Sequence, residues 1–134
     1  MSSPTYAKTI IIPESAIDEN GHVNNVVYIQ WMQDIAVEHY ASIGGVEAQG
    51  ADATWVVREH KVEYLLPAFA GEEIEIKTWI ENIRRVRSLR KYEFVRKSDG
   101  KILVRGETDW VFVDIKTGSP CAIPNEVMRV FAGG

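Results

Sequence analysis

Residues 18–25, DENGHVNN, gather an acid, a glycine, a histidine and asparagines directly before an apolar, aromatic run. Hydrolysis of an acyl group requires a nucleophile or a general base at the carbonyl carbon, and preorganised donors at the carbonyl oxygen. The carboxylate of Asp18 suits the first task. If a helix begins after this stretch, its first-turn amides lack partners inside the helix and suit the second.

Each residue of this stretch also has a purely structural interpretation. Asp18 is either the acid of a reaction or an exposed loop acid that caps a turn. His22 either orients Asp18 or a substrate, or holds the loop through a backbone hydrogen bond. Asn24 or Asn25 is predicted to cap the helix, because an amide oxygen accepts a free first-turn N–H. Gly21 allows the backbone to approach a bound group closely.

The run after this stretch has the spacing of one long amphipathic helix, predicted from residue 26 to about residue 43. Its apolar residues recur every three or four positions, whereas Asp34 and Glu38 fall on the opposite side. Gly44 and Gly45 are suited to end it. The predicted inner face comprises Tyr28, Trp31, Met32, Ile35, Ala36, His39, Tyr40 and Ile43.

Short β-branched and alternating segments predict a sheet that wraps around this helix, which is an α+β fold. In residues 72–83, for example, apolar and charged side chains alternate. Asp99-Gly100 is a strong hairpin signal between the last two strands. Self-association through sheet faces or edges is a further hypothesis. The predicted strands are residues 6–13, 54–67, 72–83, 88–97 and 102–115, and a short helix is predicted at 124–131.

Size and composition set outer limits on function. The chain has 134 residues, a net charge of −4 and a pI of about 5.4. This size predicts one domain over residues 1–134, and the acidic balance argues against nucleic-acid binding. The single cysteine, Cys121, excludes an internal disulfide framework, and no Cys/His cluster has zinc-ligand spacing. Without a signal peptide or a membrane-length apolar run, the sequence predicts a soluble, cytoplasmic protein with no membrane partner.

Three segments together resemble one family. They are DENGHVNNVVY (residues 18–28), WVVREHKVEYLLPAFAGEEIEI (residues 55–76) and GETDWVFVDIKTGSP (residues 106–120). The chain is similar to hotdog-fold acyl-CoA thioesterases of the 4-hydroxybenzoyl-CoA thioesterase-like branch, and its middle segment is also similar to acyl-ACP thioesterases. The first segment is the most specific because it fixes several positions, whereas the other two mostly indicate the fold.

The resemblance implies a single hotdog domain, with a five-stranded antiparallel sheet around one long helix, that hydrolyses acyl-CoA or acyl-ACP to a free carboxylic acid. It implies that Asp18 is the catalytic aspartate, as nucleophile or general base, and that the backbone N–H near Asn25 polarises the carbonyl. It also implies a homodimer or homotetramer that binds acyl thioesters at subunit interfaces, with no metal and no redox cofactor. The acyl group stays open, as does the choice between coenzyme A and a carrier protein.

Further candidate residues keep two interpretations each. Four residues of the predicted helix either line an acyl pocket or belong to the core: Tyr28, Trp31, Met32 and Ile35. His60 and Glu63, on a predicted strand, are expected to be core or surface residues. A basic cluster binds either CoA phosphates or an acidic carrier protein, or it forms a solvated hairpin end. This cluster comprises Arg84, Arg85, Arg87, Arg90 and Lys91.

Other activities are less well supported by the sequence. It has no G-x-S-x-G elbow, so an α/β-hydrolase mechanism is unsupported. Another hotdog branch carries its carboxylate on the long helix, but here Asp34 and Glu38 lie on the polar side. A hotdog dehydratase is disfavoured because no Asp/His pair has the spacing that this branch uses. The main alternative is a non-catalytic acyl-CoA- or acyl-carrier-binding subunit on the same fold.

Overall fold

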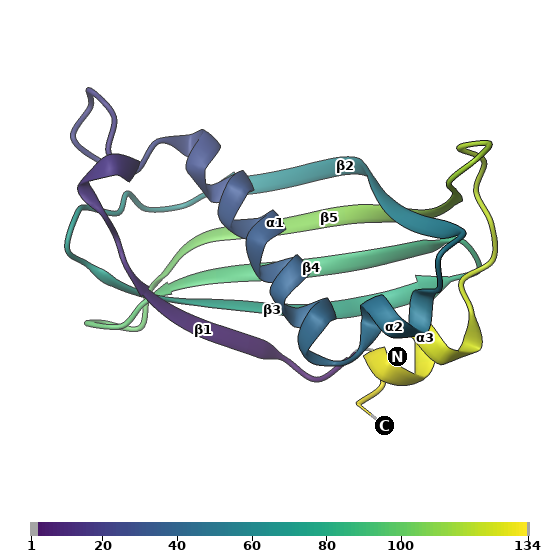
Figure 1. Cartoon of the computed structure of the whole chain (residues 1–134). Coiled ribbons are helices and arrows are strands. Elements are labelled where there is room, and N and C mark those ends of the chain that lie inside the picture. The colour runs from purple at the N-terminus through teal and green to yellow at the C-terminus, as the bar shows by residue number, and fades with distance from the viewer. Residues whose placement is uncertain (1–2, 134) are drawn as a thin grey trace.

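The computed structural model describes residues 3–133, in which one long helix, α1 (Asn25–Ser42), lies across a five-stranded antiparallel sheet (Figure 1). The predicted α+β architecture is therefore confirmed. The strands are β1 (Tyr6–Ile11), β2 (Ala53–Tyr64), β3 (Glu73–Arg84), β4 (Arg87–Arg96) and β5 (Ile102–Asp114). The other helices are the single 3-10 turn η1 (Glu14–Ala16) and the short helices α2 (Gly45–Gln49) and α3 (Asn125–Phe131).

The strand order in the sheet is β1-β3-β4-β5-β2, so the last four strands do not form a simple meander. β1 pairs with β3, which leaves β2 to pair with β5 at the opposite edge. The connection between β2 and β3, residues 65–72, therefore crosses one end of the molecule. There the amide of Val23 donates to Ala68 O at 2.9 Å, and the amide of Gly71 donates to Ile12 O at 2.8 Å. This crossing places the connection beside the loop that precedes α1.

The core lies between α1 and the inner face of the sheet. The predicted alternation of β3 is confirmed, because Ile74, Ile76, Thr78 and Ile80 are all buried. From α1, Tyr28, Met32 and Ile35 are buried against this face. The helix packs so closely on β5 that a Cβ on Gly106 would lie 2.8 Å from Met32 Sδ. Glycine at this position therefore permits the close contact between helix and sheet.

The chain turns sharply after α1 and then forms a helix that the sequence pattern did not predict. Gly44 has a φ of 83°, which is the left-handed conformation expected where a helix ends. Gly45 instead begins α2 and sits against the ring of Tyr40. A Cβ built on Gly45 would lie 2.2 Å from two ring carbons of Tyr40. The glycine pair therefore ends one helix and also allows the next one to pack against it.

Substitution of Gly45 by alanine should lower the free energy of unfolding by about 1–3 kcal/mol, the usual cost of overpacking a well-filled site. Denaturant unfolding of the wild type and of Gly45→Ala measures this difference. The Tyr40→Ala background is the control, because removing the ring should remove most of the penalty. An equal penalty in both backgrounds would show that the contact with Tyr40 is not its cause.

A buried polar network lies at the C-terminal half of α1. Arg90, on the inner face of β4, donates from Nη1 to His39 Nδ1 at 2.9 Å and to Thr78 Oγ1 at 3.0 Å. Arg90 is 3% exposed and His39 is 4% exposed. Because Nδ1 of His39 accepts this bond, the imidazole is neutral. Burial first, and the Arg90 guanidinium second, lower the pKa of His39 from its ordinary 6.5 to about 4.

The stability of the protein should therefore fall as the pH is lowered from about 6.5 to about 4. In this range the unfolded His39 binds a proton and the folded one does not, which favours unfolding by at most about 3 kcal/mol. His60 adds to the same trend, because burial lowers its pKa too. Denaturant unfolding as a function of pH measures the slope. His39→Asn, whose amide oxygen can replace Nδ1, should flatten it, and an unchanged slope in this variant would contradict the assignment.

Candidate active site

The loop before α1 is a closed turn that is tied at both ends. Ile17 and Val23 form an isolated antiparallel bridge. Inside it, the amide of Asp18 donates to His22 O at 3.1 Å and the amide of Gly21 donates to Asp18 O at 3.0 Å. Gly21 has a φ of 83°, a conformation that favours glycine, and nothing lies within 4 Å of a Cβ built on it. The backbone conformation, and not crowding inside this chain, therefore explains the glycine.

The start of α1 leaves one amide without a partner. Asn24 is the cap, because its Oδ1 accepts from the amide of Val26 at 3.0 Å. The amide of Val27 donates to the backbone oxygen of Asn24 at 3.0 Å. The amide of Asn25, the first residue of the helix, has no acceptor among residues 3–133. The sequence left the cap open between the two asparagines, and the structure assigns it to the first.

A cavity of about 270 Å³ opens at this end of α1. It is formed by the loop before the helix, the first turn of the helix and the chain that leaves β2. Tyr64 closes one side, and its hydroxyl donates to the backbone oxygen of Asn25 at 3.0 Å. The unpartnered amide and the cavity therefore belong to the same helix end. The lining residues are His22, Val23, Asn25, Tyr28, Tyr64, Leu65, Leu66 and Pro67.

Tyr28 also lines this cavity, and its hydroxyl is a second donor without a partner within the described chain. Its side chain is buried. The ring packs against three aromatic rings, those of Phe94 at 5.1 Å, Trp31 at 5.5 Å and Tyr64 at 5.8 Å between centroids. Burial first, and then the charges of Glu72 and Tyr64, raise the pKa of Tyr28 to about 12. The hydroxyl is therefore protonated at neutral pH and can donate.

His22 lines the cavity without contacting the acid of its loop through its side chain. Its Nδ1 lies 3.5 Å from Val23 O, at the outer limit of a hydrogen bond, and its ring meets the edge of Phe69 at 6.4 Å between centroids. No hydrogen bond joins the His22 ring to Asp18 within residues 3–133. The geometry thus favours a role in the wall of the cavity over one in orienting the carboxylate.

Asp18 caps a turn in the same loop. Its Oδ1 accepts from the amide of Asn20 at 2.9 Å, and Oδ2 has no partner in the described part of the chain. The side chain is half-buried and does not line the cavity. The structure therefore brings together His22, Asn25 and Tyr28, and it leaves Asp18 next to them with one carboxylate oxygen unused.

The other predicted binding residues lie elsewhere. Trp31 is half-buried and packs on Tyr28 and Phe94 behind the cavity. Arg84 and Arg85 are exposed at the turn between β3 and β4. This turn is at the far end of the sheet from the start of α1 (Figure 1), since the other end of β3 pairs with the end of β1 that leads into the loop. Within one chain, these arginines are not near the cavity.

The remaining members of the basic cluster have defined partners. Arg87 forms an ion pair with Asp109 on β5. Lys91 lies 3.6 Å from Glu107. Arg90 departs from the prediction of a basic surface cluster, because its side chain points into the core. It shares the inner face of β4 with Tyr92 and Phe94, a two-residue alternation that the sequence already contains.

The acidic and histidine residues with weaker predictions also lie away from the cavity. On α1, Asp34 accepts from Gln30 at 2.8 Å, and Glu38 forms an ion pair with Lys8 at 2.7 Å. On β2, His60 Nδ1 lies 2.9 Å from Thr108 Oγ1, and Glu63 is exposed. None of these residues lines the cavity at the start of α1.

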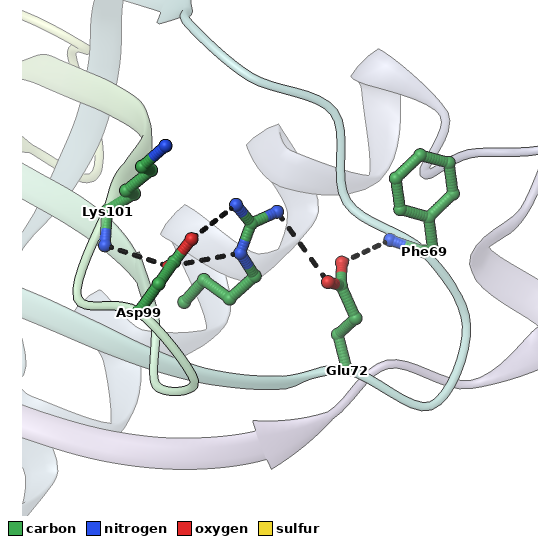
Figure 2. A network of polar contacts seen from close by, with 5 residues as sticks. Phe69, Glu72, Asp99 and Lys101 are labelled. Carbon is green, nitrogen blue, oxygen red and sulfur yellow. Dashed lines mark hydrogen bonds and ion pairs between the residues drawn. The ribbon is translucent and has the colours of Figure 1, made fainter.

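A polar network that the sequence did not reveal braces the cavity wall. Figure 2 shows Glu72 accepting from the amide of Phe69, at 2.7 Å, which closes the turn after Leu65, Leu66 and Pro67. Arg96 joins Glu72 at 3.6 Å to Asp99 at 2.7 Å, and so connects this turn to the hairpin between β4 and β5. Asp99 also accepts from the amide of Lys101 at 3.1 Å (Figure 2). In the sequence, the one local sign of this network is an acid, Glu72, directly after the turn glycine Gly71.

Residues 3–133 contain no group of three or more His, Cys, Asp or Glu side chains placed to hold a metal ion. None of their helices combines the length and the apolar character needed to cross a membrane.

Solved structures with the same architecture include several thioesterases. The 1,4-dihydroxy-2-naphthoyl-CoA thioesterase of Synechocystis has a TM-score of 0.84 at 14% identity, with 96% of each chain covered. An acyl-ACP thioesterase of Bacteroides thetaiotaomicron has a TM-score of 0.86 at 20% identity, covering 96% of this chain and 53% of the other. At these identities the likeness establishes the hotdog fold.

Sequence comparison identifies the family. The chain is similar to the chloroplastic acyl-[acyl-carrier-protein] hydrolase FATB3 of Cuphea viscosissima, with 25% identity over 124 residues. That match covers 87% of this chain and only 30% of the plant protein. The family model of the thioesterase-like superfamily matches residues 13–131, which is nearly the whole chain. The chain therefore belongs to the thioesterase-like superfamily.

Proposed function

We propose that this protein hydrolyses acyl thioesters at the start of α1 and releases a free carboxylic acid and a thiol. The observation that carries the proposal is the unpartnered amide of Asn25 on the wall of a cavity. An N–H at a helix start, aided by the helix dipole, stabilises negative charge on a carbonyl oxygen. Family membership supports the reaction class, and the site residues are our inference.

In the proposed mechanism the thioester oxygen accepts hydrogen bonds from Asn25 N–H and Tyr28 O–H. Water attacks the carbonyl carbon, and Asp18 takes its proton through the unused Oδ2. The tetrahedral intermediate then collapses, the C–S bond breaks, and the leaving thiolate takes the proton from Asp18, which restores the carboxylate. Because Asp18 does not line the cavity, a water between its carboxylate and the carbon fits better than direct attack by the carboxylate.

Isotope labelling can detect direct attack by Asp18, because only that route can place an oxygen atom of water in its side chain. A single turnover in H₂¹⁸O should place the label in the released acid and none in the protein if water attacks. Direct attack forms an acyl anhydride with Asp18, and its hydrolysis at the aspartyl carbon would leave ¹⁸O in that side chain. Mass spectrometry of the peptide that contains Asp18 reads the outcome.

The substrate class is proposed from the walls of the cavity. They are mainly apolar and aromatic, which suits an aryl or medium-length acyl group carried by coenzyme A or an acyl carrier protein. The test of function is release of free thiol from a panel of acyl-CoA and acyl-ACP substrates. Saturable binding without thiol release would favour the alternative, a non-catalytic acyl-binding subunit.

We also propose that the protein works as a homodimer or homotetramer. Apolar side chains stand exposed around the cavity, including Val26 at 69%, Phe69 at 45% and Leu65 at 41% exposure. β2 is an edge strand with one free side, which a second copy can extend. A partner at this edge would cover the exposed groups and could bring basic residues of its own to a bound nucleotide. Light scattering after size exclusion measures the number of subunits.

Substitution of Tyr28 by phenylalanine should lower kcat/KM by about fivefold, the value of one net hydrogen bond of about 1 kcal/mol. The same change should raise the free energy of unfolding by about 1 kcal/mol, because the buried hydroxyl has no partner in the free protein. These opposite signs distinguish a substrate donor from a structural one. Thiol-release kinetics and denaturant unfolding measure the two effects, and a loss of stability would contradict the assignment.

A further inference from the structure

A second cavity, of about 210 Å³, lies between the C-terminal half of α1, α2, α3 and the inner face of the sheet. Its walls are apolar and aromatic, with Tyr40, Trp55, Trp110 and Phe131 among them. Ser88 and Arg90 provide polar groups from β4. None of its lining side chains is acidic.

This cavity is separate from the one at the start of α1. The two share no lining residue. Tyr28 and Tyr40, one from each cavity, are twelve residues apart on α1, which corresponds to roughly 18 Å along the helix axis. Met32, fully buried against β5, lies between them on the helix. An inference about the second cavity therefore does not depend on the proposed thioesterase site.

Arg90 has a positive charge in this cavity without a negative partner. Its side chain is 3% exposed, and its two acceptors, His39 Nδ1 and Thr78 Oγ1, are both neutral. No carboxylate among residues 3–133 lies within 4.0 Å of it. Its Nε and Nη2 donors have no acceptor in that part of the chain either. A buried guanidinium without a counter-charge is costly, and a bound anion would offset this cost.

Other donors without partners line the same cavity. Ser88 precedes Arg90 by two residues on the same face of β4, and its buried hydroxyl has no hydrogen-bond partner. The indole N–H groups of Trp55 and Trp110 are also buried without a hydrogen bond. They lie near the hydroxyls of Tyr40 and Tyr92 respectively, but their geometry does not make a bond. Positive charge and donors thus gather in a cavity whose remaining wall is mostly apolar and aromatic, with Gln49 and Thr54 as its other polar residues.

We propose that this second cavity binds a small organic monocarboxylate with an aromatic or branched aliphatic body. The carboxylate accepts from Arg90 and Ser88, and the body packs among Tyr40, Trp55 and Phe131. Arginine pairs with carboxylates through parallel hydrogen bonds, which its unused donors allow. The volume corresponds to roughly seven water molecules, at about 30 Å³ each, so it admits one small ring or a short branched chain.

Isothermal titration of the full chain with phenylacetate tests the proposal, and phenylacetamide serves as the neutral isostere. We expect saturable binding of phenylacetate at least tenfold tighter than that of the amide. Isovalerate should bind as well, whereas acetate, which lacks the apolar body, should bind at least tenfold more weakly. Equal affinity for phenylacetate and its amide, or no saturable binding up to millimolar concentrations, would overturn the proposal.

Substitutions locate the binding site. Arg90→Met should abolish phenylacetate binding, whereas Arg105→Met, which removes an exposed arginine from β5, should leave it unchanged. Removing a buried charge without a counter-charge should also leave the fold intact or more stable, which thermal unfolding measures. If Arg90→Met does not fold, Ser88→Ala gives the answer, with an expected loss of affinity of at least threefold. Phenylacetate binding that survives either substitution unchanged would place the ligand elsewhere and refute the assignment.

Discussion

Replacing Asn25 by proline should lower the turnover number for an acyl thioester by about a hundred- to a thousand-fold, the usual effect of removing one donor to a developing oxyanion. Proline lacks the backbone N–H that we place on the carbonyl oxygen. The substitution should not disturb the helix, because Asn25 is its first residue and its amide has no partner in the free protein. Asn24 precedes it with a ψ of 133°, an extended conformation that a following proline favours.

Asn25→Ala is the matched control for this experiment. It removes the same side chain but keeps the amide, so its turnover number should stay close to that of the wild type. Thermal unfolding should show both variants folded, and proline should be slightly stabilising because it restricts the unfolded chain. An equal loss of activity in both variants would assign the effect to the asparagine side chain. Full activity in Asn25→Pro would exclude the amide from the mechanism.

Local chemistry explains why the start of the site could be predicted from sequence. A glycine with positive φ, an asparagine cap and an apolar face every three or four residues are short-range patterns, and the structure has all of them. The strand boundaries were also predicted to within a few residues, because inward and outward side chains alternate. The resemblance of residues 18–28 then connected this helix start with an acyl-transfer reaction.

The strand order and the polar network of Arg96 could not be predicted, because both depend on contacts between segments that are distant in sequence. The order β1-β3-β4-β5-β2 depends on which strands pair across long sequence separations, and no local pattern in the sequence records those pairings. The brace of Arg96 on Glu72 and Asp99 likewise joins segments that are distant in sequence. Arg90 is a different case, because its place on the inner face of β4 follows from alternation with Tyr92. Assigning Arg90 to a basic cluster because of its charge misses this alternation.

Replacing Asp18 by asparagine should lower the turnover number by about a hundred- to ten-thousand-fold, as expected when a general base is removed. The fold should survive, because the amide oxygen of asparagine can still accept from the backbone of Asn20 and preserve the turn. The loop also keeps its backbone hydrogen bonds from Asp18 N–H to His22 O and from Gly21 N–H to Asp18 O. Loss of activity in a folded Asp18→Asn variant would therefore assign the carboxylate a role in the reaction and not only in the turn. Thiol release at saturating substrate, with circular dichroism as the check on folding, measures both.

Glu19→Gln is the control for charge, since it removes one exposed acid from the adjacent position of the same loop. Its turnover number should remain within a few-fold of the wild type. If Asp18→Asn also retained nearly full activity, the carboxylate would only cap its turn, and another group would have to activate the water. If both Asp18→Asn and Asn25→Pro are inactive and folded, then the same reaction needs the carboxylate, which activates the water, and the Asn25 amide, which binds the carbonyl oxygen.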